Sequence, residues 1–213
     1  MTLEQGLAEF LTHLGLEKNA SDKTVKSYRE DLTQALTFAR EKLEKPAIEP
    51  RDWNTRLLRA FVSWLHEKNY AKSTIARRLA AVRSFGKFLC REGTINVNPA
   101  QGLRGPRADK KLPHFLTVAD IQLLLAAPND AGWAGHRDRA ILETLYSAGV
   151  RVSELVGLNL ADTDLNEGIA TVRGKGKKER LALLGPAAVT AIREWLPKRT
   201  AILEHLRRES DAI

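Results

Sequence analysis

The sequence has few of the features that mark secreted, membrane-spanning or fibrous proteins. Cys90 is the single cysteine among 213 residues, which excludes an internal disulfide and a zinc site built from several cysteines of one chain. No apolar run approaches the roughly 18 residues of a membrane helix, and the N-terminus lacks the basic start and long apolar stretch of a signal peptide. Internal repeats and low-complexity tracts are also absent. With 43% hydrophobic and 28% charged residues, the composition predicts a globular cytoplasmic protein with no membrane partner.

Positive charge is concentrated in the first half of the chain. Lys and Arg number 34 against 26 Asp and Glu, which gives a formal net charge of +8. Residues 1–107 carry 19 basic and 12 acidic side chains, whereas residues 108–213 carry 15 and 14. This asymmetry favours a polyanionic partner for the first half, most commonly nucleic acid. An ordinary soluble surface that happens to be basic is the alternative.

The first hundred residues show the three- and four-residue apolar spacing of amphipathic helices. One helix is expected near residues 3–16, and Ser21, Asn54 and Ser73 are candidate N-caps for three more. The fourth helix should run to about Arg91. These patterns predict a small helical bundle over residues 1–103.

A change of composition follows this predicted bundle. Residues 103–113 contain one Gly, two Pro and five charged side chains, and they have no apolar periodicity. This composition predicts an exposed linker over residues 104–113. Residues 114–213 then form a second, mixed region.

The second region combines predicted helices with a β-hairpin. Helices are expected from the Thr117 cap to residue 127, over residues 136–148 with Gly149 as the stop, and over residues 152–158. The β-compatible runs 169–173 and 179–184 are joined by five residues with two glycines, which favours a hairpin. Pro186 and Pro197 are each expected to open a further helix.

Basic residues of the helix after Ser73 are candidates for contacts with DNA phosphates. At about 100° per residue, Arg83, Lys87 and Arg91 fall on one flank of the apolar stripe, and Arg77 lies nearby. The linker offers four more cations for a phosphate backbone, namely Arg104, Arg107, Lys110 and Lys111. A solvated helix face and a solvated linker are the alternatives.

Arg151 and Glu154 form a second candidate feature. Arg151 stands at the start of a short predicted helix, directly after the glycine-terminated one, and Glu154 follows three residues later. This geometry can hold an arginine in a cleft, oriented by a carboxylate. Arginine suits a phosphodiester because its fork binds two oxygens at once. By spacing alone, a local ion pair within the helix is the alternative.

The tip of the predicted hairpin is basic. It carries Lys175, Lys177 and Lys178 between and after two glycines, and a lysine on such a tip can reach into a bound substrate. The tip lacks the Gly-Lys-Ser/Thr and the spacing of a nucleotide-binding loop, which excludes that function. A solvated basic turn is the alternative.

Taken together, several segments resemble the tyrosine recombinases, and within them the bacterial Xer subfamily. The resemblance is carried by residues 21–24 with Tyr28 and Asp31-Leu32, and by residues 73–74, 81–85, 98–99, 137–142, 147–158 and 174–180. It covers nearly the whole chain, and residues 149–156, Gly-Val-Arg-Val-Ser-Glu-Leu-Val, are its most specific part. The resemblance implies a mainly α fold with a small β-hairpin or sheet. An N-terminal SAM-like core-binding bundle would be followed by part of an α+β catalytic domain.

The resemblance also implies an activity. Family members cleave and rejoin DNA strands through a 3′-phosphotyrosine, and Xer systems resolve chromosome dimers at cell division. The implied partners are a double-stranded recombination site and a related recombinase subunit in a tetrameric synapse, with no cofactor and no metal. Arg151 matches the first catalytic arginine, Lys175 matches the general acid of the hairpin, and Glu154 matches a supporting acidic position. An arginine placed in advance stabilises charge on the nonbridging oxygens, and a lysine can protonate the departing 5′-oxygen.

The sequence departs from the family pattern after the hairpin. The family continues with a His-x-x-Arg segment and a nucleophilic tyrosine far downstream, whereas this chain ends 62 residues after Arg151. Tyr28, Tyr70 and Tyr146 all precede Arg151, so no family nucleophile is expected in this chain. Tyr28 and Tyr146 fall in helical apolar patterns, and Tyr70 ends a helix. The expectation is a recombinase truncated within its catalytic domain.

A pattern near the end of the chain mimics the missing segment. His205-Leu-Arg-Arg208 has the His-x-x-Arg form, but it comes only 54 residues after Arg151 and suits an amphipathic helix. We therefore predict that it is not the family motif. A non-catalytic DNA-binding module or regulator and a helical interaction protein without a DNA role remain the alternative functions.

Overall fold

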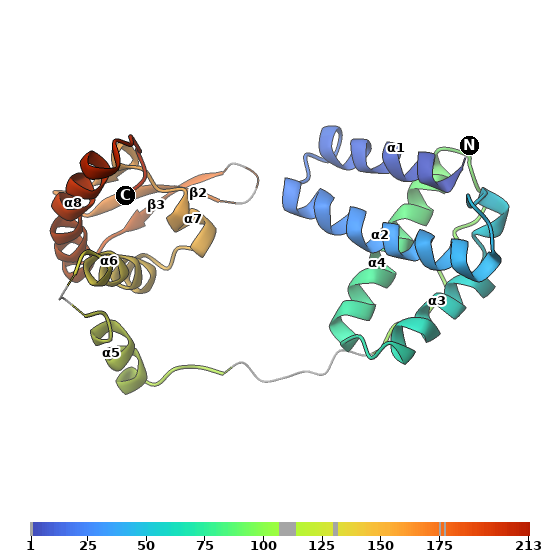
Figure 1. Ribbon diagram of the computed structural model, residues 1–213, viewed down its shortest axis with the longest axis horizontal. Helices are drawn as coiled ribbons and strands as arrows, with labels where there is room; N and C mark the ends of the chain where they lie inside the picture. Colours follow the sequence, from blue (N-terminus) through green and yellow to red (C-terminus); the bar gives the residue numbers. More distant parts are fainter. Residues whose placement is uncertain (1, 107–113, 130–131, 175, 177) are drawn as a thin grey trace. The chain divides into compact units, whose positions relative to one another are not determined.

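The computed structural model describes residues 2–106, 114–129, 132–174, 176 and 178–213. The chain divides into two compact units, Met1–Leu112 and Pro113–Ile213, and each has its own hydrophobic core (Figure 1). Five of the predicted site residues lie outside the described residues: Arg107, Lys110, Lys111, Lys175 and Lys177.

In the described part of the first unit, all regular secondary structure is helical. Its elements are α1 (Leu3–Leu16), α2 (Asp22–Leu43), the 3-10 helix η1 (Pro50–Asp52), α3 (Thr55–Glu67) and α4 (Lys72–Arg91). Ser21 and Asn54 are confirmed as caps, because their side chains accept the backbone N–H groups of Thr24 and Leu57. The predicted Ser73 cap is wrong. Helix α4 begins at Lys72, so Ser73 lies inside it, and the N-cap Ala71 has no side chain that could accept a hydrogen bond.

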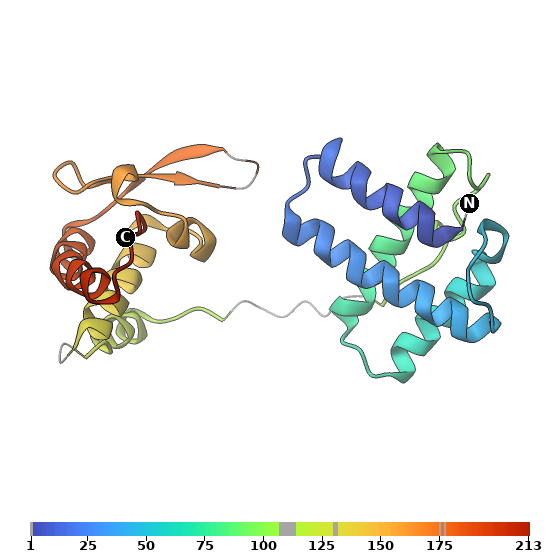
Figure 2. The same cartoon turned by 45° about the horizontal axis from the view of Figure 1, so that its top comes forward.

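Aromatic rings fill the centre of the first unit. Phe10, Phe61 and Phe85 are each at most 2% exposed, and the ring centroids of Phe10 and Phe85 lie 5.6 Å apart. Helices α2 and α4 pack against each other, and each of them also packs against α1 and α3 (Figure 2). The apolar stripes that the sequence predicts on α2, α3 and α4 therefore meet in one core.

The second unit packs helices against a small antiparallel sheet. Its elements are α5 (Val118–Ala126), α6 (Trp133–Ala148), α7 (Val152–Val156), η2 (Leu160–Asp162), β1 (Thr163–Asp164), β2 (Ile169–Arg173), β3 (Glu179–Leu183) and α8 (Pro186–Leu206). The strand order is β1-β2-β3 with Ile169 opposite Leu183, and α6 and α8 pack together on one side of the sheet (Figure 2). The predicted hairpin and the mainly α fold class are confirmed.

Helix α8 corrects one prediction. The sequence suggested two helices that open at Pro186 and Pro197, but α8 continues from Pro186 to Leu206 with Pro197 inside it. Ile192 and Trp195 before the proline, and Arg199 after it, are all buried. Burial of one continuous face therefore outweighs the hydrogen bond that Pro197 cannot donate. Among the described residues, no helix is both long enough and apolar enough to cross a membrane.

Candidate functional site

Arg151 lies in the turn between α6 and α7. Helix α6 ends at Ala148, and Gly149 adopts the left-handed conformation with φ of 55°, which turns the chain sharply. Arg151 is then the N-cap of α7, and its side chain is 72% exposed. The turn therefore presents the guanidinium of Arg151 to solvent at the start of a helix.

The buried carboxylate of Glu154 holds the Arg151 side chain in place. The Glu154 side chain is 1% exposed, and its two oxygens accept hydrogen bonds from the backbone N–H of Arg151 at 2.9 Å and from Arg151 Nη1 at 2.6 Å. A second guanidinium, that of Arg180 on β3, donates to Glu154 Oε2 at 3.0 Å. The bond from the Arg151 amide, together with the bonds from the two guanidinium groups, lowers the pKa of the Glu154 carboxyl against the opposing effect of burial. An ionised carboxylate thus orients two arginines.

The base of the β2–β3 hairpin contacts the same carboxylate. The Gly174 N–H donates to the Lys178 carbonyl at 2.8 Å and closes the turn, and Gly176 has a positive φ of 78°. A Cβ built at Gly174 would lie 3.2 Å from Glu154 Oε1, so the absence of a side chain there lets the hairpin lie close to α7. Lys178 is exposed. Glu154 therefore joins Arg151 to the hairpin on which Lys175 is predicted to act.

Arg180 is the site residue that the sequence analysis missed. It belongs to the segment that carries the family resemblance, but 26 residues separate it from Glu154. The contact arises because Arg180 pairs with Val172 in the sheet while α7 packs against β2. An alternating strand pattern alone could not have identified this partner, although an arginine directly after the hairpin turn was visible.

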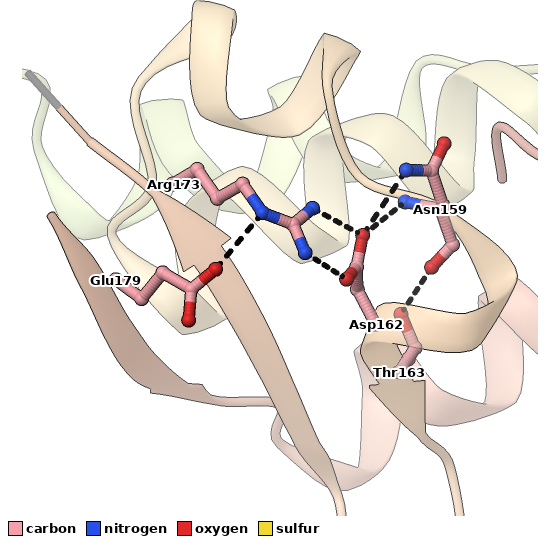
Figure 3. A network of polar contacts seen from close by, with 5 residues as sticks. All are labelled: Asn159, Asp162, Thr163, Arg173 and Glu179. Carbon is pink, nitrogen blue, oxygen red and sulfur yellow. Dashed lines mark hydrogen bonds and ion pairs between the residues drawn. The ribbon is translucent and has the colours of Figure 1, made fainter. Parts of the chain in front are cut away.

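A separate network fixes the hairpin on its other side (Figure 3). Arg173 on β2 donates two hydrogen bonds to Asp162, at 2.9 and 2.8 Å, and a third to Glu179 at 3.0 Å. Asp162 also accepts from Asn159, and the bonds from Arg173 are the largest cause of its lowered pKa. Each of the three nitrogens of the Arg173 guanidinium therefore donates a hydrogen bond within the protein. We infer that this network holds the hairpin in place.

The candidate DNA-contact residues of α4 have different surroundings. Arg77 donates from Nη1 to Ser27 Oγ at 2.9 Å and to Asp31, and its side chain is 49% exposed. Arg83 turns toward the backbone and donates to the carbonyls of Ala100 and Leu103. Arg91 contacts His13 and Glu92. Lys87 on α4 and Arg104 after the helix are exposed.

The three tyrosines do not share one setting. Tyr28 and Tyr70 are partly buried against the core of the first unit. Tyr146 on α6 is 62% exposed, so its predicted place in an apolar helix face is wrong. Gly149 terminates α6 one turn later, and the described part of the unit leaves this side of α6 uncovered.

Two family descriptions match this chain, and each match falls within one of the two structural units. Residues 7–93 match "Phage integrase, N-terminal SAM-like domain", and residues 114–212 match "Phage integrase family". The chain therefore belongs to the phage integrase family, the tyrosine recombinases.

Curated relatives narrow the family assignment. The tyrosine recombinase XerC of Thermodesulfovibrio yellowstonii is 42% identical over 193 residues, which cover 91% of this chain and 62% of the relative. The XerC of Pseudomonas aeruginosa is 42% identical over 197 residues, covering 91% and 63%. The resemblance to the Xer subfamily is therefore confirmed, and these relatives are XerC proteins. This chain spans a little less than two thirds of the length of these relatives.

Solved structures share the fold. The integrase of transposon Tn1549 in complex with a circular intermediate DNA matches with a TM-score of 0.71 at 19% identity, over 93% of this chain and 66% of that one. A lambda integrase tetramer bound to a Holliday junction matches with a TM-score of 0.66 at 19% identity, over 95% and 57%.

Proposed function

We propose that this chain supplies the DNA-binding unit and the first part of the catalytic centre of an Xer-type tyrosine recombinase. Such a protein would act in the cytoplasm on a double-stranded recombination site, together with a related subunit in a tetrameric synapse, to resolve chromosome dimers. The observation that carries the proposal is the exposed Arg151 guanidinium, held by the buried carboxylate of Glu154 beside the hairpin. The XerC relatives support the same assignment.

The proposed chemistry assigns one task to each group. Arg151 stabilises the negative charge that develops on the nonbridging oxygens of the scissile phosphate, and Glu154 fixes the guanidinium before the substrate arrives, which lowers the cost of reorganisation. Lys175 delivers the proton that the departing 5′-oxygen needs. Arg180 shares the Glu154 carboxylate and links this arginine to the hairpin.

The 213-residue chain itself is proposed to bind DNA without cleaving it. Tyr28, Tyr70 and Tyr146 all precede Arg151, and two of the three belong to the first unit. None takes the place of the family nucleophile, which follows the hairpin. We expect salt-sensitive duplex binding dominated by residues 1–111, where most of the positive charge lies.

The position of all three tyrosines before Arg151 also favours a second candidate function, that of a non-catalytic DNA-binding module or regulator. A chain that is extended with the downstream segment of an XerC relative distinguishes the two functions. If this chain supplies the first part of a catalytic centre, the extended chain should form a covalent complex with a nicked duplex. If it is a module that has lost its catalytic geometry, no covalent complex should form.

Variants of the extended chain test the role of Arg151. Arg151→Ala should reduce the yield of covalent complex at least a hundredfold, the scale of removing one prepositioned transition-state donor. Arg208→Ala removes an exposed arginine from the end of the chain and serves as the matched control. Equal yields from the two variants would contradict the assignment of Arg151.

A further inference from the structure

A groove between α2 and α4 of the first unit has the side chains of a phosphate site. Its volume is about 330 Å³, and its walls include Lys23, Thr24 and Ser27 from α2 and Arg77 and Ala80 from α4. Two cations and two hydroxyl groups thus face one space, and Ala80 is an exposed small residue that lets a sugar–phosphate backbone approach closely. Of these residues, the sequence analysis selected Arg77 alone.

Asp31 lies at the base of this groove and holds Arg77. Asp31 is 3% exposed, and Arg77 donates to it and to Ser27 Oγ from the same nitrogen, Nη1. Nε and Nη2 of Arg77 have no hydrogen bond to any described residue in the structure. Because the Ser27 hydroxyl accepts from Arg77, its own proton remains available for another acceptor. A phosphate oxygen in the groove can therefore receive hydrogen bonds from both residues.

Stability alone does not account for the Asp31 carboxylate. Burial raises its pKa, although Arg77 and Arg78 lower it, so desolvation outweighs the attraction of two arginines. Arg78 Nε lies 3.6 Å from Asp31, and its guanidinium lies 3.9 Å from the centroid of the Tyr70 ring. A buried ion pair of this kind is often no more stabilising than an apolar contact. Its clear effect is to fix where Arg77 points.

We propose that this groove binds one backbone phosphate of duplex DNA, and that Asp31 is a positioning residue that orients Arg77 toward it. The inference rests on the proposed function, because it gives the DNA-binding unit one specific phosphate contact. Arg77 supplies two donor nitrogens, Nε and Nη2, Ser27 and Thr24 supply hydroxyl donors, and Lys23 adds charge at the rim.

Asp31→Asn gives the sharpest test, because two explanations predict opposite signs. The variant removes a negative charge from a basic unit, so electrostatics alone predicts tighter duplex binding. Loss of positioning predicts weaker binding, by about tenfold, which is the scale of one lost charge-assisted phosphate contact. The measurement is fluorescence anisotropy of a short labelled duplex over a series of KCl concentrations. Glu41→Gln makes the same charge change on the exposed part of α2 and should bind as tightly as wild type or more tightly.

Two further variants keep the test valid if Asp31→Asn fails to fold. Ser27→Ala changes no charge and should weaken binding severalfold, about 1 kcal/mol of hydrogen bonding. Lys23→Gln should lower the slope of log Kd against log salt by about one. Lys42→Gln is its control, since Lys42 is exposed on the same helix 19 residues away, about 28 Å along its axis.

The outcomes separate this inference from the proposed function. Wild-type chain that binds no duplex would overturn the proposed function and this contact together. Duplex binding by wild type, with Asp31→Asn folded and binding more tightly, or with Ser27→Ala unchanged, would overturn the phosphate site alone. Weaker binding by both variants, with Glu41→Gln and Lys42→Gln near wild type, is the expected result.

Discussion

Each unit holds an exposed arginine against a buried carboxylate, but the two carboxylates contribute differently to folding. Glu154 accepts a backbone amide and two guanidinium groups, and its pKa is lowered. Asp31 is more affected by burial than by its arginines, and its pKa is raised. An acid with a lowered pKa stabilises the fold when ionised, whereas an acid with a raised pKa costs stability when ionised. Both carboxylates hold the guanidinium of an arginine whose side chain is about half exposed or more, Arg77 at 49% and Arg151 at 72%.

The lowered pKa of Glu154 predicts a pH dependence of stability. The stabilisation should be fully present above the carboxyl's ordinary value of 4.5, and it should be lost as the pH falls through the lower value in the folded protein. Urea unfolding from about pH 6 to about pH 3 measures this dependence. In Glu154→Gln, the free energy of unfolding should fall less steeply as the pH is lowered than it does in wild type. Glu209→Gln, which changes an exposed acid, is the control, and an equally steep fall in the two variants would contradict the account.

Arg83 and Lys87 should separate stability from DNA binding. We expect the double Gln variant to weaken duplex binding and flatten its salt dependence. Because Arg83 donates to the carbonyls of Ala100 and Leu103, Arg83→Gln alone should also destabilise the first unit by about 1–3 kcal/mol, whereas Lys87→Gln should not. Thermal unfolding of both single variants checks this difference. An unchanged salt slope in the double variant would show that this flank does not meet phosphate.

At the scale of elements, local chemistry was predictable and long-range contacts were not. Caps such as Ser21, Asn54 and Thr117, and the glycine stop at Gly149, depend on side chains within a few residues, so the sequence identifies them. The two-residue strand β1 exists only because it pairs with β2, and it has no pattern of its own. The contacts of Asp31 with Arg77 and of Glu154 with Arg180 join different elements, so they required the fold.

Helix α8 carries the clearest prediction at this scale. Pro197 lies inside the helix, where it removes a hydrogen bond to the preceding turn. Pro197→Ala should therefore stabilise the second unit by about 1–3 kcal/mol, as measured by urea unfolding. Pro186→Ala is the control, because the N–H that proline lacks at the first turn has no helical partner. A lower stability of Pro197→Ala would show that the helix requires the proline's geometry.

At the scale of the whole molecule, the two units differ in how well they bury their apolar residues. The first unit packs phenylalanine and leucine side chains, whereas alanines make up much of the core of the second. In the second unit Phe115, Leu123, Val156 and Leu183 are more than two thirds exposed, and α5 has no buried residue. Among the described residues, fewer buried apolar side chains therefore stabilise the second unit than the first.

Hydrogen exchange should reveal this difference. Amides in α2 and α4 should exchange slowest, and those in α5 fastest among the helices, because exchange protection follows buried contacts. Exchange measured by mass spectrometry at neutral pH gives both rates in one experiment. Protection of α5 equal to that of α4 would contradict the burial pattern.

The central proposal is that this chain supplies the DNA-binding unit and the Arg151 part of a tyrosine recombinase centre, and that it does not cleave DNA by itself. Incubation of the 213-residue chain with a nicked suicide duplex, followed by denaturing electrophoresis, tests it directly. The account predicts a retarded duplex in a parallel native gel and no covalent band, because Tyr28, Tyr70 and Tyr146 all precede Arg151 in the chain. A covalent protein–DNA band from this chain alone would contradict the claim.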